Sequence, residues 1–339
     1  MSIHPPQNRT GRRLPLTVYV VLCATVLAGA GLVAALNRGS SPFHTVPAKP
    51  LATTAIPVAT IPVAAIQPAA LQVVPHPSGG KLLICGGGNL PPAIRNEFCK
   101  LAGGPDARIV VIPTATSHAD HPEYLAKLLA DWKTCDVGSV NLLHTRSRET
   151  ANDPLFVQSL TEATGVWLTG GDQVFLTDTY LGTAVQEQLK GVLSRGGVVA
   201  GTSAGAAVMS GVMIAGGRDK ADVSQGFDFI KGAVIDQHFL KRNRMDRLIG
   251  VLALHPNLVG LGIDEETALV VDVREHHLSV LGASYVVACV PDSQHKSVRL
   301  KFLKSGDTTA MADLMKAAVV ETTAGVKTDE PAGLTVGSL

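Results

Sequence analysis

A serine enclosed by small residues is the side chain in this sequence best suited to act as a nucleophile. Ser203 lies in Gly201-Thr202-Ser203-Ala204-Gly205, which has the spacing G-x-S-x-G. Small neighbours let the chain turn sharply from a strand into a helix, so the serine hydroxyl projects beyond the sheet. Backbone N–H groups at the helix start then face any anion formed there. The pentapeptide alone also fits a structural glycine-serine turn, so its surroundings must decide.

A serine hydroxyl needs a base of near-neutral pKa to accept its proton, and imidazole is such a base. Of the eleven histidines, His238 is the candidate. It ends the triplet Asp236-Gln237-His238, which follows the strand-like residues 233–235, and it comes 35 residues after Ser203. In this part of the chain His238 alone follows a β-rich run and lies among polar residues.

A glycine pair completes this set of residues. Gly170-Gly171-Asp172-Gln173 directly follows a strand-like run, which is where backbone N–H donors would lie beside a serine turn. An α/β-hydrolase of the esterase type is the first interpretation of such a set. In that fold, however, further strand–helix units usually separate the serine from the histidine. The short interval here therefore favours a different α/β fold.

The elements that must position these residues begin at Lys81. Short β-branched runs alternate with turns and helical stretches, which predicts a three-layer α/β/α fold with a mostly parallel sheet and helices on both faces. The serine and glycine turns then fall at the carboxyl ends of strands. The predicted strands are 81–85, 108–112, 139–143, 165–169, 197–201 and 262–271, and the clearest helical stretches are 122–133 and 183–194.

Four motifs together resemble the cyanophycinase and peptidase E family of serine exopeptidases. They are Gly-Gly-Asp-Gln at 170–173, Gly-Thr-Ser-Ala-Gly-Ala at 201–206, Val-Ile-Asp-Gln-His-Phe at 234–239 with three arginines after it, and Gly-Ile-Asp-Glu-Glu-Thr-Ala at 262–268. The resemblance covers roughly residues 81–290. It implies a fold like that of flavodoxin and the class I glutamine amidotransferases. It also implies hydrolysis of the β-aspartyl-arginine polymer cyanophycin to dipeptides.

The resemblance implies a role for each matching residue. Ser203 would be the nucleophile and His238 the general base, with the N–H groups of Gly171 and Ala204 as the oxyanion hole. Guanidinium groups suit substrate carboxylates, whereas carboxylates and amides suit a substrate arginine. Without the resemblance, the basic residues would be interpreted as a solvated helix face. The implied substrate-binding residues are Asp172, Gln173, Asp236, Gln237, Arg242, Arg244 and Arg247.

The acid of the triad is predicted in the loop between the serine and the histidine. Family members carry an acidic residue there, in a loop that is longer than residues 216–229 of this sequence. The family offset falls near Ala221, so Asp219 is predicted to orient His238, with Asp222 as the alternative. Because this loop also shapes the cleft, its shortening leaves the identity of the substrate open. Gly86-Gly87-Gly88-Asn89 lacks the residues of a phosphate loop and predicts a tight turn near the site.

The chain before Lys81 has a different composition. Residues 1–96 hold seven of the 29 basic residues and none of the 28 acidic ones. The net charge of +1 is therefore the sum of a basic first part and an acidic remainder. Arginines precede an apolar, uncharged run long enough to cross a bilayer, which predicts a cytoplasmic N-terminus and an external domain. The predicted parts are a basic N-terminus at 1–13, a transmembrane anchor or signal segment at 14–36, a Pro/Ala-rich linker at 37–80, a peptidase domain at 81–320 and a flexible tail at 321–339.

We expect no metal or other cofactor, since the five cysteines show no metal-ligand spacing. The balance of charge excludes a polybasic nucleic-acid binder. The expected partners are a peptide or β-aspartyl polymer as substrate, the membrane through the N-terminal segment, and a second copy in a homodimer. The expected location is extracytoplasmic, anchored by the N-terminal helix or secreted after its cleavage. Two alternatives stay open, namely an aspartyl or isoaspartyl dipeptidase of the same family and a non-catalytic extracytoplasmic binding domain on this fold.

Overall fold

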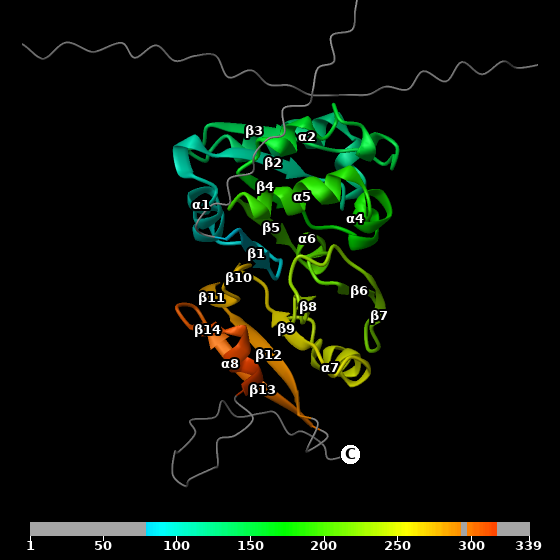
Figure 1. Ribbon diagram of the computed structural model, residues 1–339, viewed down its shortest axis with the longest axis vertical. Coiled ribbons are helices and arrows are strands. Elements are labelled where there is room, and N and C mark those ends of the chain that lie inside the picture. The colour runs from blue at the N-terminus through cyan, green and yellow to red at the C-terminus, as the bar shows by residue number, and fades with distance from the viewer. Residues whose placement is uncertain (1–78, 293–296, 317–339) are drawn as a thin grey trace, which may run out of the picture. The chain divides into compact units, whose positions relative to one another are not determined.

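The computed structural model describes residues 79–292 and 297–316 (Figure 1). The predicted segments 1–13, 14–36 and 321–339, and the linker up to residue 78, lie outside the described residues. Among the helices that the structure does describe, none is long and apolar enough to span a membrane.

Five parallel strands form one side of the larger sheet, out to its edge at β3. These strands lie in the spatial order β1-β5-β4-β2-β3, and each adjacent pair is parallel. Strands β1, β2, β4 and β5 are hydrophobic along most of their length because both of their faces are covered, as in other parallel sheets. The bounds are β1 Lys81–Cys85, β2 Arg108–Ile112, β3 Ser139–Leu142, β4 Gly165–Leu168 and β5 Val198–Thr202.

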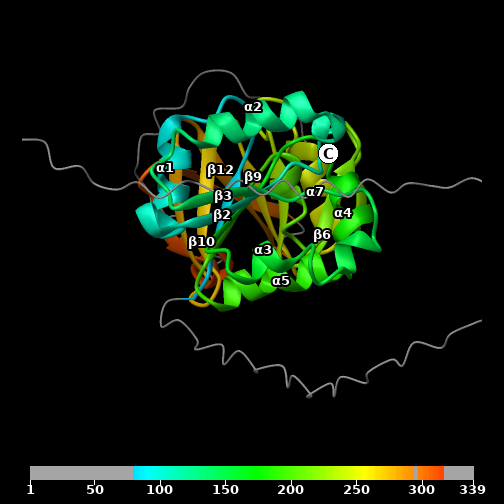
Figure 2. The same ribbon diagram turned by 90° about the horizontal axis from the view of Figure 1, so that it is seen from above.

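Helices cover both faces of this sheet, as Figure 2 shows. On one face α1 (Pro92–Leu101) and α2 (Pro122–Trp132) bury an aromatic cluster of Phe98, Trp132 and Trp167. The other face carries α3 (Gln158–Thr161), α4 (Gln173–Tyr180), α5 (Ala184–Ser194) and the short α6 (Ala204–Ala207). The predicted three-layer α/β/α fold is therefore confirmed. The 3-10 helices are Gly104–Asp106, Ser117–Asp120 and Thr150–Asn152.

The structure also has strands and helices outside these five parallel strands and their covering helices. Three antiparallel strands extend the large sheet beyond β1, a second sheet of four strands follows the order β13-β12-β9-β8, and a hairpin pairs β6 with β7. The added bounds are β6 Val212–Gly216, β7 Asp222–Gln225, β8 Ala233–Gln237, β9 Val259–Ile263, β10 Thr267–Asp272, β11 His277–Gly282, β12 Tyr285–Asp292, β13 Ser297–Lys304 and β14 Thr308–Ala310, with helices α7 Met245–Leu254 and α8 Met311–Lys316.

The prediction of one strand over 262–271 is wrong in an informative way. The chain forms β9 in the small sheet, turns at residues 264–266, and continues as β10 in the large sheet. Polar side chains stabilise this turn, because Asp264 accepts hydrogen bonds from the Lys241 N–H (2.9 Å) and the Ser284 hydroxyl (2.7 Å). Glu266 adopts a left-handed φ of 58°. The turn therefore links the two sheets.

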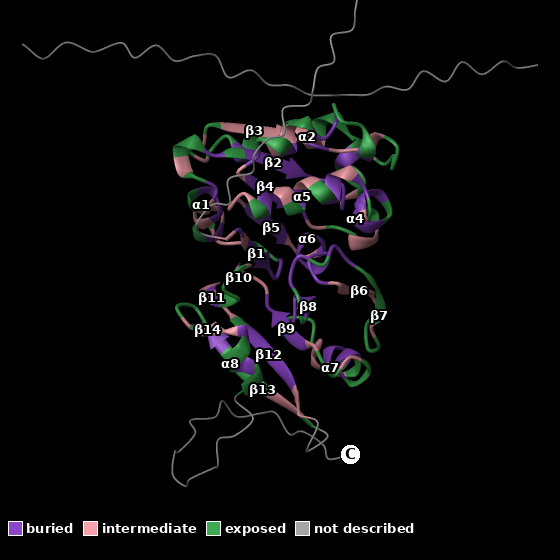
Figure 3. Cartoon of the chain, in the orientation of Figure 1, coloured by how far each residue is buried: buried purple, intermediate pink, exposed green. Residues whose placement is uncertain are grey.

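The buried residues concentrate in the large sheet and the small sheet. The central strands are buried, whereas all four residues of β7 are exposed (Figure 3). The β6–β7 hairpin is the part of the molecule that contains the loop in which the acid of the triad is predicted.

Candidate active site

Ser203 lies at the turn between β5 and α6, with the strained backbone angles φ 52° and ψ −109°. Its N–H donates to the Cys85 carbonyl at 3.0 Å, and its own carbonyl accepts from Ala206 and Ala207 in the following turn. A Cβ atom on Gly201 would lie 2.2 Å from the Gly205 carbonyl oxygen. The G-x-S-x-G spacing is therefore required by the turn itself, which holds the serine in a conformation that most residues avoid.

His238 extends from the end of β8 to the serine. Its Nε2 lies 2.8 Å from Ser203 Oγ, and its N–H donates to the Gly86 carbonyl at 2.8 Å. The imidazole rests against Gly87, where a Cβ atom would come within 2.4 Å of His238 Cε1. The glycine turn after β1, which is predicted to lie near the site, thus forms the surface beneath the ring.

The carboxylate that contacts His238 belongs to Glu265, in the turn between β9 and β10. Glu265 Oε1 lies 2.6 Å from His238 Nδ1. The structure does not bring Asp219, or its predicted alternative Asp222, to His238, because both are exposed on the β6–β7 hairpin. Glu265 was hidden inside the predicted strand 262–271. The signal that could have found it is the polar triplet Asp264-Glu265-Glu266 in the middle of a β-rich run.

The two hydrogen bonds of His238 define its protonation. An ionised Glu265 accepts the Nδ1 proton, which leaves the Nε2 lone pair free to accept the Ser203 hydroxyl proton. Burial lowers the pKa of His238, the hydrogen bond to Glu265 opposes this, and the positive charges of Arg242 and Arg244 lower it further. The imidazole is consequently neutral, and able to act as a base, at neutral pH.

Backbone donors lie beside the serine. A Cβ atom on Gly170 would come within 3.5 Å of Ser203 Cβ, so the turn after β4 packs directly against the nucleophile. Gly171 follows with φ 143°, and a Cβ atom there would lie 2.2 Å from the Ala115 carbonyl oxygen. Ala204 opens α6, so no earlier helical turn takes its N–H. The predicted pair therefore lies close to the nucleophile in the chain or in space, since Gly171 follows the glycine that packs against Ser203 and Ala204 is the next residue after Ser203.

Comparison with known proteins matches this geometry to a family. The family model described as peptidase family S51 matches residues 82–279. The chain belongs to this family. It is 38% identical over 208 residues to a cyanophycinase of Nostoc sp., covering 58% of this chain and 68% of the relative. It is 34% identical over 228 residues to a cyanophycinase of Thermosynechococcus vestitus, covering 63% of this chain and 70% of the relative.

A solved structure supports the same assignment. The crystal structure of a peptidase from an acI-B1 Actinobacterium matches 69% of this chain and 98% of its own, with a TM-score of 0.54 and 26% identity. The predicted resemblance and the enzyme class are thus confirmed, and the protein is a serine-type peptidase with a flavodoxin-like fold.

Several residues predicted to bind substrate in this S51 peptidase are hydrogen-bonded to other parts of the protein. Asp236 is fully buried and accepts two hydrogen bonds from the guanidinium of Arg247, with Nε at 2.7 Å from Oδ2. Burial raises the pKa of Asp236, and Arg247 opposes that rise. Arg247 also donates to the Gly217 carbonyl in the hairpin turn. The pair therefore fixes the hairpin to β8.

Gln173 acts on the same hairpin from the other side. Its amide nitrogen donates to the carbonyls of Ile214 (2.9 Å) and Ala215 (2.7 Å) in β6. Asp172 accepts from the Val174 N–H at 2.8 Å and caps α4. Both side chains lie at the carboxyl end of the sheet, as predicted, but their hydrogen bonds stabilise the protein itself.

The remaining three residues of this set differ from one another. Arg244 donates to the carbonyl of Gln237 at 2.6 Å and to its side-chain oxygen. Burial and the charge of Arg247 lower the pKa of Arg244 to about 10. Arg242 is exposed next to His238, and among the described residues its guanidinium has no carboxylate within ion-pair distance. Arg242 is accordingly the cation best placed to meet a substrate.

An arginine supports the glycine turn of this S51 peptidase from behind. Arg146 donates to the carbonyls of Thr114 (2.6 Å) and Thr116 (2.7 Å), on either side of Ala115. The Ala115 carbonyl in turn accepts from the Asp172 N–H at 2.8 Å, next to Gly171. Arg146 thus holds the loop against which the proposed oxyanion donor rests.

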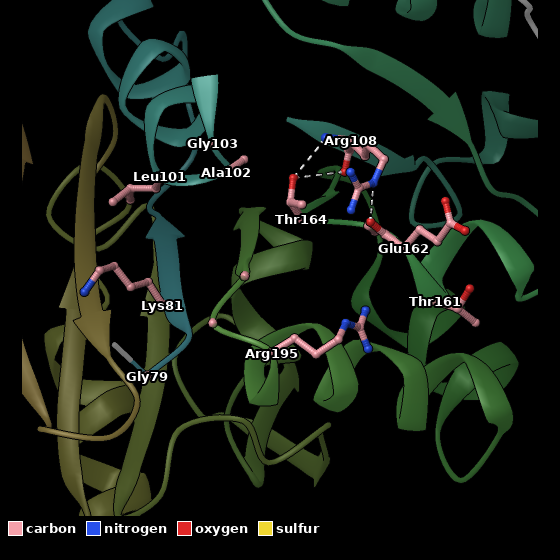
Figure 4. Close-up of a pocket in the computed structure, with 13 residues that line it drawn as sticks. Gly79, Lys81, Leu101, Ala102, Gly103, Arg108, Thr161, Glu162, Thr164 and Arg195 are labelled. Carbon is pink, nitrogen blue, oxygen red and sulfur yellow. Dashed lines mark hydrogen bonds between the residues drawn. The ribbon is translucent and has the colours of Figure 1, made fainter. Parts of the chain in front are cut away.

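A cavity of about 470 Å³ lies at the opposite ends of the strands and contains none of these site residues (Figure 4). Lys81, Arg108 and Arg195 line it together with the glycines that precede β1 and β5. The two arginines donate to the carbonyls of Glu162 (2.7 Å) and Leu160 (2.9 Å). The two arginines therefore stabilise the end of α3, Lys81 pairs with Asp272 at 2.8 Å, and all three cations are separate from the candidate site residues.

Proposed function

We propose that Ser203, His238 and Glu265 form the catalytic triad of a cyanophycinase-like exopeptidase, which hydrolyses the β-aspartyl-arginine polymer to dipeptides. The observation that carries the proposal is the continuous hydrogen-bonded chain from Ser203 Oγ (2.8 Å) through the imidazole to Glu265 Oε1 (2.6 Å). The substrate is supported by relatives named cyanophycinase at 34–38% identity.

The acylation step follows from this geometry. Ser203 Oγ attacks the aspartyl carbonyl carbon of the bond joining two dipeptide units, and its proton passes to His238 Nε2. Glu265 stabilises the imidazolium, while the N–H groups of Gly171 and Ala204 donate to the oxyanion as its charge develops. When the tetrahedral intermediate collapses, His238 gives the proton to the leaving amine, and the acyl group remains on the serine.

Hydrolysis of the acyl-enzyme repeats these steps with water. His238 accepts a proton from the water, the oxygen attacks the ester carbon, and collapse returns the proton to Ser203 Oγ. The product leaves with a free carboxylate. The guanidinium of Arg242, exposed beside the imidazole, offers the charge and the paired donors that suit a carboxylate of the substrate.

The test is release of β-Asp-Arg from the insoluble polymer by the purified full chain. Wild type is expected to release the dipeptide, and Ser203→Ala is expected to release none above the uncatalysed background. An active-site serine probe gives a second readout, because labelling should fall on Ser203 and vanish in His238→Ala. Dipeptide release that is equal in wild type and Ser203→Ala would overturn the triad.

A dipeptidase of the same family is the second candidate, and the short β6–β7 hairpin favours it. The hairpin spans Val212–Gln225 and exposes its tip, so it presents little surface to a long polymer. Short α-aspartyl and β-aspartyl dipeptides with different second residues separate the two functions. Turnover of these dipeptides without release from the polymer would favour the dipeptidase.

We also propose that residues 14–36 anchor the peptidase domain outside the membrane. The support is the run of uncharged apolar residues after Arg9, Arg12 and Arg13. The test is protease digestion of intact cells, in which an external domain is degraded and a cytoplasmic one is protected. A soluble, shortened chain in the medium would instead indicate cleavage of the segment.

We also propose that the protein forms a homodimer. Tyr285 and Phe302 lie in edge-to-face contact at 6.1 Å and are exposed on the outer part of the small sheet, together with Leu300. Exposed apolar side chains that lie next to each other often mark a protein contact. Light scattering of the purified chain is expected to give twice the monomer mass, and Phe302→Lys is expected to reduce it to the monomer.

A further inference from the structure

A buried threonine lies behind the glycine turn that carries the proposed oxyanion donor. Thr114 belongs to the loop after β2, which packs against Gly171, and its side chain is completely buried. The Thr114 hydroxyl lies 2.9 Å from His144 Nδ1 and 2.7 Å from the Tyr180 hydroxyl. The proposed catalytic steps use none of these three side chains. Their hydrogen bonds therefore need a separate explanation.

The imidazole of His144 connects Thr114 to an ion pair nearer the surface. The His144 side chain is 12% exposed, and its Nε2 lies 2.9 Å from Asp120 Oδ1. The other carboxylate oxygen of Asp120 accepts from Nε and Nη2 of Arg146, both at 3.2 Å. The carboxylate thus orients the imidazole as the acid of a catalytic triad does. The hydroxyl at the far end, however, is buried, so this network holds the protein and does not attack a substrate.

The positions of the protons follow from the donors and acceptors of this network. An ionised Asp120 accepts the proton on His144 Nε2, so Nδ1 accepts the hydroxyl proton of Thr114. The Thr114 oxygen then accepts from the Tyr180 hydroxyl, whose own oxygen accepts from the Thr145 N–H at 3.3 Å. Burial raises the pKa of Tyr180 to about 12, so the phenol keeps its proton at neutral pH. Every donor in this series therefore has an acceptor.

Helix α4 joins this network to the oxyanion turn. The helix starts directly after Gly171 and Asp172, and it ends at Tyr180. At its start, the Asp172 N–H donates to the Ala115 carbonyl at 2.8 Å. At its end, the Tyr180 hydroxyl contacts Thr114. The loop after β2 is thus bound to both ends of α4. A shift of this loop would move Gly171, where a Cβ atom would already lie 2.2 Å from the Ala115 carbonyl oxygen.

We propose that Thr114 and His144 are positioning residues of the oxyanion hole. Their hydrogen bond fixes the loop after β2 through a buried side chain, and this loop sets where the Gly171 N–H lies when the oxyanion forms. Neither residue touches the substrate. The proposal rests on the proposed function, because it acts through Gly171 on the attack by Ser203.

The first test removes the Thr114 hydroxyl and keeps the shape of the side chain. Thr114→Val should lower kcat about 10-fold and change KM by less than about twofold, since a misplaced oxyanion donor weakens binding of the transition state alone. Thr114→Ser restores a hydroxyl and should recover most of the loss. The matched control is Thr179→Val in α4, which should keep the kcat of wild type. The buried Thr179 hydroxyl donates to the Phe175 carbonyl within its own helix at 2.7 Å.

The second test separates the two nitrogens of His144. Asparagine places its amide oxygen near the position of Nδ1 and can still accept from Thr114. Glutamine reaches the position of Nε2 and keeps only the contact with Asp120. His144→Gln should therefore lower kcat about 10-fold, whereas His144→Asn should lower it less than about 3-fold. The reverse order would show that the contact with Asp120 positions the loop, and it would overturn the proposal. This pair decides the question if Thr114→Val does not fold.

Labelling of Ser203 by a fluorophosphonate, with the purified full chain, is a readout that needs no known substrate. Negative charge develops on the phosphoryl oxygen of the probe in the oxyanion hole, so Thr114→Val should be labelled about 10-fold more slowly than wild type. A lower Tm of Thr114→Val with the kcat and labelling rate of wild type would show a purely structural role and overturn the proposal. Labelling that is equal in wild type and Ser203→Ala would instead overturn the proposed triad, and this proposal with it.

Discussion

The two sides of the active site are built in different ways. The serine side belongs to the large sheet and is local, since Ser203 is held by the strand before it, the helix after it and the adjacent β1. The histidine side depends on contacts between remote segments. His238 extends from the small sheet, and Glu265 from the turn that connects the small sheet to the large one.

This difference indicates which part of the site is more sensitive to substitutions at remote positions. The serine turn is fixed by glycines within its own pentapeptide, whereas the imidazole depends on Gly87, in the turn after the first strand, and on Glu265, near the other end of the domain. Changes at remote positions should therefore damage the histidine side selectively. The variants below test this contrast, beginning with the largest expected effect.

Glu265→Gln should reduce kcat by about 10⁴-fold with little effect on stability. An amide of the same shape can donate to Nδ1, which favours the tautomer whose Nε2 carries a proton and cannot accept one from Ser203. The measurement is steady-state hydrolysis of a substrate that wild type turns over. Asp219→Asn is the matched control and should retain full activity. Loss of activity in Asp219→Asn, with retention in Glu265→Gln, would restore the original prediction for the acid.

Gly87→Ala should lower kcat by about 10²-fold, because the new Cβ atom would come within 2.4 Å of His238 Cε1 and must displace the ring from Ser203. The positive φ of 102° adds backbone strain. Gly250→Ala in α7 is the control, since nothing lies within 4 Å of its new Cβ atom. Labelling by a serine probe should slow in the first variant alone. Equal activity in both variants would show that the ring tolerates displacement.

The contacts on which these two predictions depend differ in how clearly the sequence reveals them. The serine turn, the parallel strands and His238 could be predicted because each depends on a local sequence pattern. These patterns are the glycine spacing around the serine, the alternation of strand-like and helical segments, and the polar triplet after a strand. Glu265 was missed, because the β-rich run from Gly262 to Val271 conceals a turn between two sheets, which only the acidic residues in its middle indicate. The contacts of Gln173 and Arg247 with the β6–β7 hairpin were also missed, since there both side chains bind carbonyl oxygens, which no side-chain pattern reveals.

Arg146→Lys should reduce kcat by about 10-fold and leave KM nearly unchanged. Lysine keeps the charge but lacks the guanidinium fork whose two nitrogens reach the carbonyls of Thr114 and Thr116, so the loop beneath Gly171 is held less firmly. A loss confined to kcat is the expected result of a less well positioned oxyanion donor. Arg148→Lys, which alters an arginine outside this loop, is the control. A change in KM alone would indicate that Arg146 affects binding and not the donor.

The smallest expected effect concerns the pH dependence of kcat/KM, which tests the surroundings of His238. Burial and the charges of Arg242 and Arg244 lower the pKa of His238, so kcat/KM should remain high as the pH falls through 6.5 and decline only below it. The folded protein disfavours the imidazolium. The free energy of unfolding should therefore decrease as the pH falls below the pKa of a histidine in the unfolded chain. Arg242→Gln removes one positive charge and should move the acid limb upward by a few tenths of a pH unit, whereas Arg218→Gln, on the hairpin tip, should leave it in place. An acid limb that stays fixed in Arg242→Gln would show that the charge of Arg242 is screened from the imidazole, and that burial and Arg244 lower the pKa of His238 without it.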